Sequence, residues 1–157
     1  MQVLKSILYI LFAGALCAQN ERDANKKLIE NFIENIFNER ELNQISDYVT
    51  PDYIEHSNGV TTSSVASLIK TVKFLEETAD DFHLEIEQIL AEQDNVMVLW
   101  NYQGFNKEYQ KKVALSGVFI ARIADDKIVE GWQIFDNFTR LKQLGFEVIA
   151  PPDSLAP

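Results

Sequence analysis

Apolar residues recur at helical spacing through the first part of the chain. From Asp23 to Glu39 they fall at intervals of three and four residues, which predicts a long amphipathic helix with one broad apolar face. A shorter helical segment is predicted over Leu42–Val49, and it must end near Pro51 because proline disfavours helix in the residue before it. A third helix is predicted to begin after Ser63 or Ser64, since either serine side chain can cap its first turn.

The pattern changes to an alternation of apolar and polar residues from Phe82–Glu87 onward. This period of two is typical of strands with one buried face. Further strands are predicted over Val96–Tyr102, Lys112–Ile123 and Ile128–Phe138, and a tight Asp125-Asp126 turn joins the last two. Helices followed by about four antiparallel strands predict an α+β domain, with the helices gathered on one face of the sheet.

The last predicted strand carries an acid where an apolar residue would be expected. Trp132, Ile134 and Asp136 share one face of this strand, while Gln133 and Phe135 share the other. The acid is either a strand-end residue in water or a carboxylate held in an apolar pocket. In the second case burial would raise its pKa and suit it to proton transfer.

The N-terminus has the layout of a secretory signal peptide. In Met1–Ala18, one lysine is followed by an apolar run that is short for a membrane span and then by small residues. Cleavage is expected after Ala18, which makes the protein secreted or periplasmic. Lipidation of Cys17 is the alternative, although Leu16 stands where such signals have a small residue. The domain is expected over 19–148, with a loose proline-rich tail over 149–157.

Composition narrows the classes of partner. The formal net charge of -10 argues against nucleic acid and against anionic membrane surfaces as partners after signal removal. The chain has one cysteine and two histidines, with no paired spacing of metal ligands and no glycine-rich phosphate loop. We therefore expect neither a metal nor a cofactor.

Several motifs together resemble one known family. They are Tyr53-Ile-Glu-His56, Ala91-Glu-Gln-Asp94, Asp126-Lys-Ile-Val-Glu-Gly-Trp132, Asp136 and Gln143-Leu-Gly145. Over roughly residues 26–146 the chain is similar to the SnoaL-like polyketide cyclases of the nuclear transport factor 2-like superfamily. The resemblance implies a cone-shaped α+β barrel with about three N-terminal helices on a curved, mainly antiparallel sheet of four to six strands.

The resemblance also implies roles for individual residues. Asp136 matches an acid/base of the family's cofactor-free aldol cyclisation, and His56 is placed near the cavity mouth. Four aromatic residues in or beside the predicted sheet are expected to contact substrate: Tyr53, Trp100, Tyr102 and Trp132. This chain has Gly104-Phe105-Asn106 where many relatives carry Gly-Thr-His. The alternatives are that Asp136 caps the start of a last helical turn and forms an ordinary ion pair with the nearby Arg140, and that His56 lies in a surface loop.

Three hypotheses for function follow. The first is a cofactor-free cyclase, dehydratase or isomerase, in which Asp136 moves a proton and His56 or a tyrosine polarises a carbonyl. The second is a protein that binds a small apolar or carbonyl-containing ligand without converting it. The third is an association domain that forms a homodimer through exposed apolar residues such as Met97, Leu99 or Phe135. The triplet Asn137-Phe138-Thr139 is also a formal glycosylation site.

Overall fold

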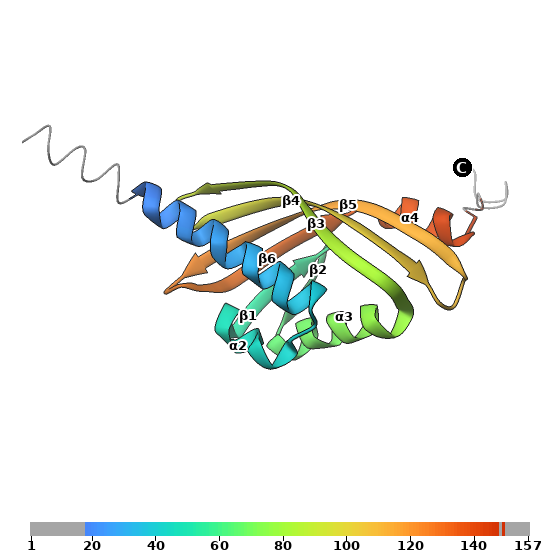
Figure 1. Ribbon diagram of the computed structural model, residues 1–157, viewed down its shortest axis with the longest axis horizontal. Helices are drawn as coiled ribbons and strands as arrows, with labels where there is room; N and C mark the ends of the chain where they lie inside the picture. The colour runs from blue at the N-terminus through green and yellow to red at the C-terminus, as the bar shows by residue number, and fades with distance from the viewer. Residues whose placement is uncertain (1–17, 148, 150–157) are drawn as a thin grey trace, which may run out of the picture.

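The computed structural model describes residues 18–147 and 149 of the chain (Figure 1). The predicted signal peptide up to residue 17, including Cys17, lies outside these residues, as does most of the tail. Export, cleavage after Ala18 and lipidation therefore stay predictions. No helix within residues 18–147 is both long enough and apolar enough to cross a membrane.

The three predicted helices lie where the apolar periodicity places them, whereas the predicted last strand ends at Phe135 and the residues from Asn137 onward form a further helix, α4. The first helix covers residues 18–32 and continues as a π-helical segment, η1. Ser64 caps α3 as predicted, because its hydroxyl accepts a 2.9 Å hydrogen bond from the backbone N–H of Ala66. The remaining bounds are η1 Ile33–Asn38, the 3₁₀ helix η2 Leu42–Gln44, α2 Ile45–Tyr48, α3 Val65–Thr78 and α4 Asn137–Leu144.

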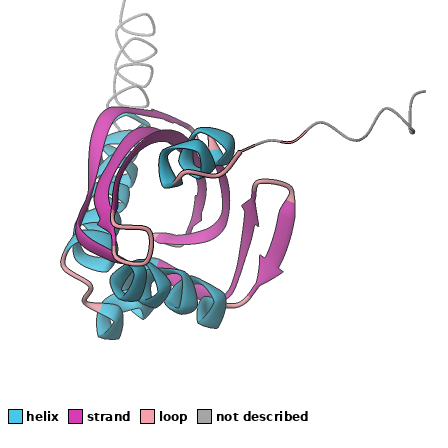
Figure 2. Cartoon of the chain, turned by 90° about the vertical axis from the view of Figure 1, so that its right-hand side faces the viewer, coloured by secondary structure: helices cyan, strands magenta, loops and turns pink. Residues whose placement is uncertain are grey.

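Six strands form one curved sheet that does not close into a barrel (Figure 2). Its order is β2-β1-β6-β5-β4-β3, with β1 parallel to β6 and every other pair antiparallel. The bounds are β1 Val49–Ser57, β2 Val60–Ser63, β3 Ala79–Glu92, β4 Asn95–Asn106, β5 Lys111–Ala124 and β6 Lys127–Phe135. The predicted α+β class is confirmed, and the sheet is mixed and open.

The hairpin of β1 and β2 is absent from the sequence-based expectation. It is joined by Asn58 and Gly59, whose φ angles of 45° and 86° are typical of a tight hairpin turn. The segment precedes the third helix and has polar residues on both faces of its second strand, so its period-two signal is weak. The Asn-Gly pair was the available signal for this turn.

The first helix packs across the inner face of the sheet, which we define as the face it covers (Figure 1). Ile29, Phe32 and Ile36 are buried against a sheet surface that includes Val98 and Phe119. The Phe32 and Phe119 rings stack with their centroids 6.2 Å apart. This packing covers one end of the inner face and leaves the other end free for a cavity.

A β-bulge at Val129 decides which side chains of β6 face inward. Ile128 is buried, but the register then shifts, so that two residues of β6 oppose one residue of β5. Such an extra residue reverses the inward and outward faces beyond it. Gln133 and Phe135 therefore face inward, and Trp132 faces outward.

Candidate functional site

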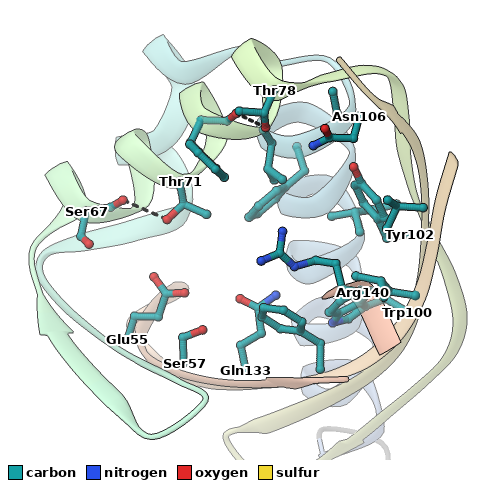
Figure 3. Close-up of a pocket in the computed structure, with 18 of the residues that line it drawn as sticks. Glu55, Ser57, Ser67, Thr71, Thr78, Trp100, Tyr102, Asn106, Gln133 and Arg140 are labelled. Carbon is teal, nitrogen blue, oxygen red and sulfur yellow. Dashed lines mark hydrogen bonds between the residues drawn. The ribbon is translucent and has the colours of Figure 1, made fainter. Parts of the chain in front are cut away.

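A cavity of about 330 Å³ lies between α3, the β1–β2 hairpin, α4 and the free end of the inner sheet face (Figure 3). Its wall is mostly apolar, with a few polar groups that converge on the space, which is typical of sites for small molecules. The apolar lining residues are Phe37, Val60, Phe74, Leu75, Ala79, Leu84, Trp100, Val113, Leu115, Phe135 and Leu144.

Glu55 places a carboxylate inside this cavity. Period two on β1 puts Tyr53, Glu55 and Ser57 on the inner face, and Glu55 is only 8% exposed. No group among the described residues donates a hydrogen bond to its carboxylate, and burial alone raises the pKa of Glu55 above its usual value. A shielded carboxyl with a raised pKa is suited to accept and return a proton.

Tyr102 and Trp100 form the opposite wall (Figure 3). Both come from β4, and their placement at the cavity agrees with the prediction for these two residues. Burial raises the pKa of Tyr102, while the nearby Arg140 charge lowers it in part. Asn106, at the end of β4, also lines the cavity and is the third residue of the Gly-Phe-Asn triplet.

Arg140 reaches the cavity from α4, and its guanidinium lies toward the middle of the space (Figure 3). Its Nε donates a 2.8 Å hydrogen bond to Oδ1 of Asn137, which holds the side chain near the helix. Within residues 18–147 it forms no ion pair, since no described carboxylate oxygen lies within 4.0 Å of it.

Asp136 lies outside the cavity. It is the N-cap of α4, and its carboxylate accepts hydrogen bonds of 2.6 Å from the Thr139 hydroxyl and 2.9 Å from the Thr139 backbone N–H. These hydrogen bonds hold the pKa of Asp136 below its usual value, and the side chain is exposed. The prediction that Asp136 lines the inner wall is wrong, because the bulge at Val129 reverses the face. The alternative of a helix cap is confirmed, but the ion pair with Arg140 that was part of it is not among the ion pairs of the described residues.

His56 also faces away from the cavity, on the outer face of the sheet. Its Nε2 lies 2.9 Å from Oε1 of Glu130, its Nδ1 lies 2.9 Å from Oγ1 of Thr61, and its ring stacks on Trp132 at 5.3 Å. Arg122 completes the network through hydrogen bonds of 2.9 and 3.1 Å to Glu130. The predicted placement of His56 and Trp132 at the cavity is therefore wrong. His56 follows Glu55 on β1 and so lies on the opposite face, and the bulge in β6 turns Trp132 outward.

Tyr53 lies deeper than the main cavity. It is 1% exposed and borders a smaller hollow of about 30 Å³, which also borders Glu55, Trp100 and Gln133. Burial and the negative charge of Glu55 raise the pKa of the Tyr53 phenol, so the hydroxyl stays protonated. Its predicted contact with substrate stays a prediction, as do those of Trp100 and Tyr102.

Several polar residues of the site were not singled out from the sequence, among them Glu55, Gln133 and Arg140. Glu55 stands inside the motif Tyr53-Ile-Glu-His56, and the alternation with buried Tyr53 was a signal that could have identified it. Gln133 faces inward only because of the bulge, which sequence periodicity does not reveal. The sequence patterns instead indicated their neighbours, His56 beside Glu55 and Trp132 beside Gln133.

The described residues contain no group of three or more histidine, cysteine, aspartate or glutamate side chains placed to hold a metal ion. The polar lining of the cavity holds one carboxylate, one guanidinium, and amide and hydroxyl groups. The expectation of a protein without metal or cofactor stays a prediction.

Comparisons with known proteins agree with this architecture. A family model described as SnoaL-like polyketide cyclase matches residues 27–144. No curated protein matches the chain significantly. Three similar solved structures show the fold.

The first is a putative polyketide cyclase from Bacillus cereus, with 23% identity and a TM-score of 0.73 over 83% of this chain and 86% of that one. The second is AclR, a putative hydroxylase from Streptomyces galilaeus, with 24% identity and a TM-score of 0.71 over 79% and 97%. The third is an LEH-like epoxide hydrolase of M. tuberculosis, with 14% identity and a TM-score of 0.66 over 79% and 91%.

Proposed function

Because this chain belongs to the SnoaL-like polyketide cyclase family, we propose that it is a cofactor-independent enzyme that moves a proton on a carbonyl-containing small molecule. Glu55 is the acid/base in this proposal. The observation that carries it is a carboxylate that is 8% exposed, inside an apolar cavity, with its pKa raised by burial. The reaction belongs to the cyclase, dehydratase or isomerase type.

The proton transfer uses groups on two walls of the cavity. The ionised Glu55 removes a proton from the carbon next to a carbonyl, and the electron pair of that C–H bond moves onto the carbonyl oxygen. Tyr102 lies on the opposite wall and remains protonated because burial raises its pKa, so its hydroxyl donates a hydrogen bond to this oxygen. The protonated Glu55 then returns the proton to the substrate, and its carboxylate is ionised again for the next cycle.

Solvent-deuterium exchange tests this chemistry without knowledge of the natural substrate. The bicyclic ketone 2-tetralone is apolar and has acidic C–H groups beside its carbonyl, so it serves as a probe. Its deuterium uptake is followed by proton NMR in D₂O. Wild type is expected to accelerate uptake, and Glu55→Gln is expected to lower that rate by about 10²- to 10⁴-fold, the usual contribution of a positioned acid or base.

Asp136→Asn is the matched control, because it also replaces a carboxylate by its amide but lies outside the cavity. It should keep most of the exchange activity. Equal loss in both variants, or exchange in Glu55→Gln at the wild-type rate, would contradict the assignment of Glu55.

A second candidate function is binding of a small apolar ligand without conversion. The mostly apolar lining of the cavity favours it. Native mass spectrometry of the purified protein distinguishes the two functions. A co-purifying molecule that is retained and unaltered, together with no tetralone exchange, supports the binder.

We also propose that the protein forms a homodimer through its outer sheet face. Side chains on β4, β5 and β6 lie opposite one another in register and form a continuous outer apolar patch. Its members are Met97, Leu99, Val118, Ile120, Trp132 and Ile134. Ile134 is 69% exposed and Met97 37% exposed, while Arg122 and Glu130 supply both signs of charge beside them. Phe135, predicted for this surface, lines the cavity instead because of the bulge.

A further inference from the structure

Two side chains of opposite charge line the same cavity without neutralising each other. Glu55 projects from β1 and Arg140 from α4 (Figure 3). They form no ion pair within 4.0 Å, and burial is the only cause that raises the pKa of Glu55, so the Arg140 charge does not stabilise its carboxylate. The cavity therefore has one acidic pole and one basic pole.

The Arg140 guanidinium, the basic pole, has N–H donors without a described hydrogen-bond partner. Arginine carries five N–H donors, and only the Nε donor of Arg140 has a described partner, namely Asn137. The two terminal nitrogens are left for a molecule in the cavity. A guanidinium binds a carboxylate through two parallel hydrogen bonds, which are stronger and more specific than bonds to a neutral oxygen.

From this arrangement we infer that the ligand carries a carboxylate or a similar anionic oxygen group, which Arg140 binds, on an apolar body that reaches Glu55. The inference rests on the proposed function for the Glu55 end, where the reacting C–H lies. The substrate class is then an apolar carbonyl compound with an anionic group at its far end. The repulsion between that anionic group and Glu55 fixes which end of the molecule lies at the acid/base.

The positive charge of Arg140 contrasts with the negative net charge of the protein. With a formal net charge of -10, the protein as a whole repels anions. Anion binding must therefore come from a local group rather than from a general electrostatic attraction. Arg140 is the cationic side chain that lines the cavity within the described residues.

A matched pair of probes tests the inference by binding alone. 2-Naphthylacetate and 2-naphthylacetamide have nearly the same shape and differ in charge. Calorimetric titration of wild type should give a roughly ten- to hundredfold tighter dissociation constant for the carboxylate, in line with a charge-assisted hydrogen-bonded pair. Arg140→Gln should reduce carboxylate affinity to the level of the amide and leave amide affinity unchanged.

Lys142→Gln is the control variant, because it removes the same charge from the same helix but does not line the cavity. It should keep the preference for the carboxylate. Amide binding by Arg140→Gln reports that its cavity is intact. The inference would be overturned if wild type bound both probes with similar affinity or bound neither. It would also be overturned if Arg140→Gln kept the wild-type preference for the carboxylate.

The proposed function and this inference fail in different experiments. Glu55→Gln should keep or increase the preference for the carboxylate, because it removes a negative charge from the same cavity, while it loses tetralone exchange. Loss of exchange with no carboxylate preference in any variant would retain Glu55 as acid/base and overturn the role of Arg140.

Discussion

Glu55 and His56 are neighbours in the sequence and lie on opposite faces of β1. The Glu55 carboxylate enters the apolar cavity, whereas the His56 ring stacks on Trp132 and contacts Glu130 on the outer face. This alternation separates an acid with a raised pKa and no hydrogen-bond donor among the described residues from a histidine whose two ring nitrogens both have partners. We therefore assign the acid/base role in the cavity to Glu55. The hydrogen-bonded network of His56, Glu130 and Arg122 lies on the outer surface of the sheet.

Replacement of Glu55 by glutamine should change how stability depends on pH. The pKa of Glu55 is higher in the folded protein than the usual 4.5, so the folded state holds this proton more tightly than the unfolded state does. This contribution is fully present below about pH 4.5 and is lost as the pH rises through the folded pKa. Glu55→Gln should therefore gain stability relative to wild type between pH 4.5 and 8, measured by urea unfolding. A gain confined to acidic pH would contradict this expectation.

Asp136 should act as a helix cap with the opposite pH dependence. Because the Thr139 hydrogen bonds lower its pKa, its contribution to stability is present above about pH 3.8 and is lost as the pH falls through the folded pKa. Asp136→Ala should lower the Tm at pH 7 and should have little effect on the binding of 2-naphthylacetate in the cavity. Asp136→Asn should lose less, since asparagine also caps helices. A strong loss of probe binding with no change in Tm would refute the cap role.

Gly117 on β5 allows the Trp100 indole on the paired strand β4 to lie close to its backbone. A Cβ atom at this position would overlap the Trp100 indole, so Gly117→Ala should destabilise the protein by about 1–3 kcal/mol. Trp100→Phe removes the atoms that overlap. The two changes should be less than additive when their free energies of unfolding are compared in a double-mutant cycle. Strict additivity would show that Trp100 does not contact this position.

A charge in the outer apolar patch should separate the proposed dimer into monomers. Ile134→Lys is expected to halve the mass measured by light scattering at micromolar concentration and to leave the Tm of the monomer unit little changed, because Ile134 is already 69% exposed. Phe138→Lys is the control, since Phe138 is a comparably exposed apolar residue on α4. A wild-type protein that is monomeric at all concentrations would refute the dimer.

The sequence predicted most of the fold because long amphipathic segments have clear periods. The first helix, predicted over Asp23–Glu39 and found over residues 18–32 with the segment η1 after it, was accessible to local rules. So were the Ser64 cap and the Asp125-Asp126 turn, and the positive φ angles of that turn agree. The β1–β2 hairpin was missed. Its second strand is short and exposed, and the parallel pairing of β1 with β6 joins segments far apart in the chain.

The site was harder to predict because it depends on one extra residue. Simple alternation along β6 placed Trp132 and Asp136 inside, but the bulge at Val129 lies upstream and reverses both. No local propensity identifies such a bulge, since its position is set by the pairing with β5. The placement of Trp100 and Tyr102 at the cavity was predictable, because β4 keeps its alternation.

Titration of the Glu55 carboxyl group shows whether this residue has the raised pKa that an acid/base in the cavity needs. Carbon-13 NMR of protein labelled at the glutamate side-chain carboxyl, with the resonance assigned by its loss in Glu55→Gln, gives the pKa of this one group in the folded protein. We expect a midpoint clearly above 4.5, and the pH dependence of tetralone exchange in wild type should follow the same midpoint. A midpoint at or below 4.5 would mean that the carboxylate is solvated or paired, and would contradict Glu55 as the acid/base of the cavity.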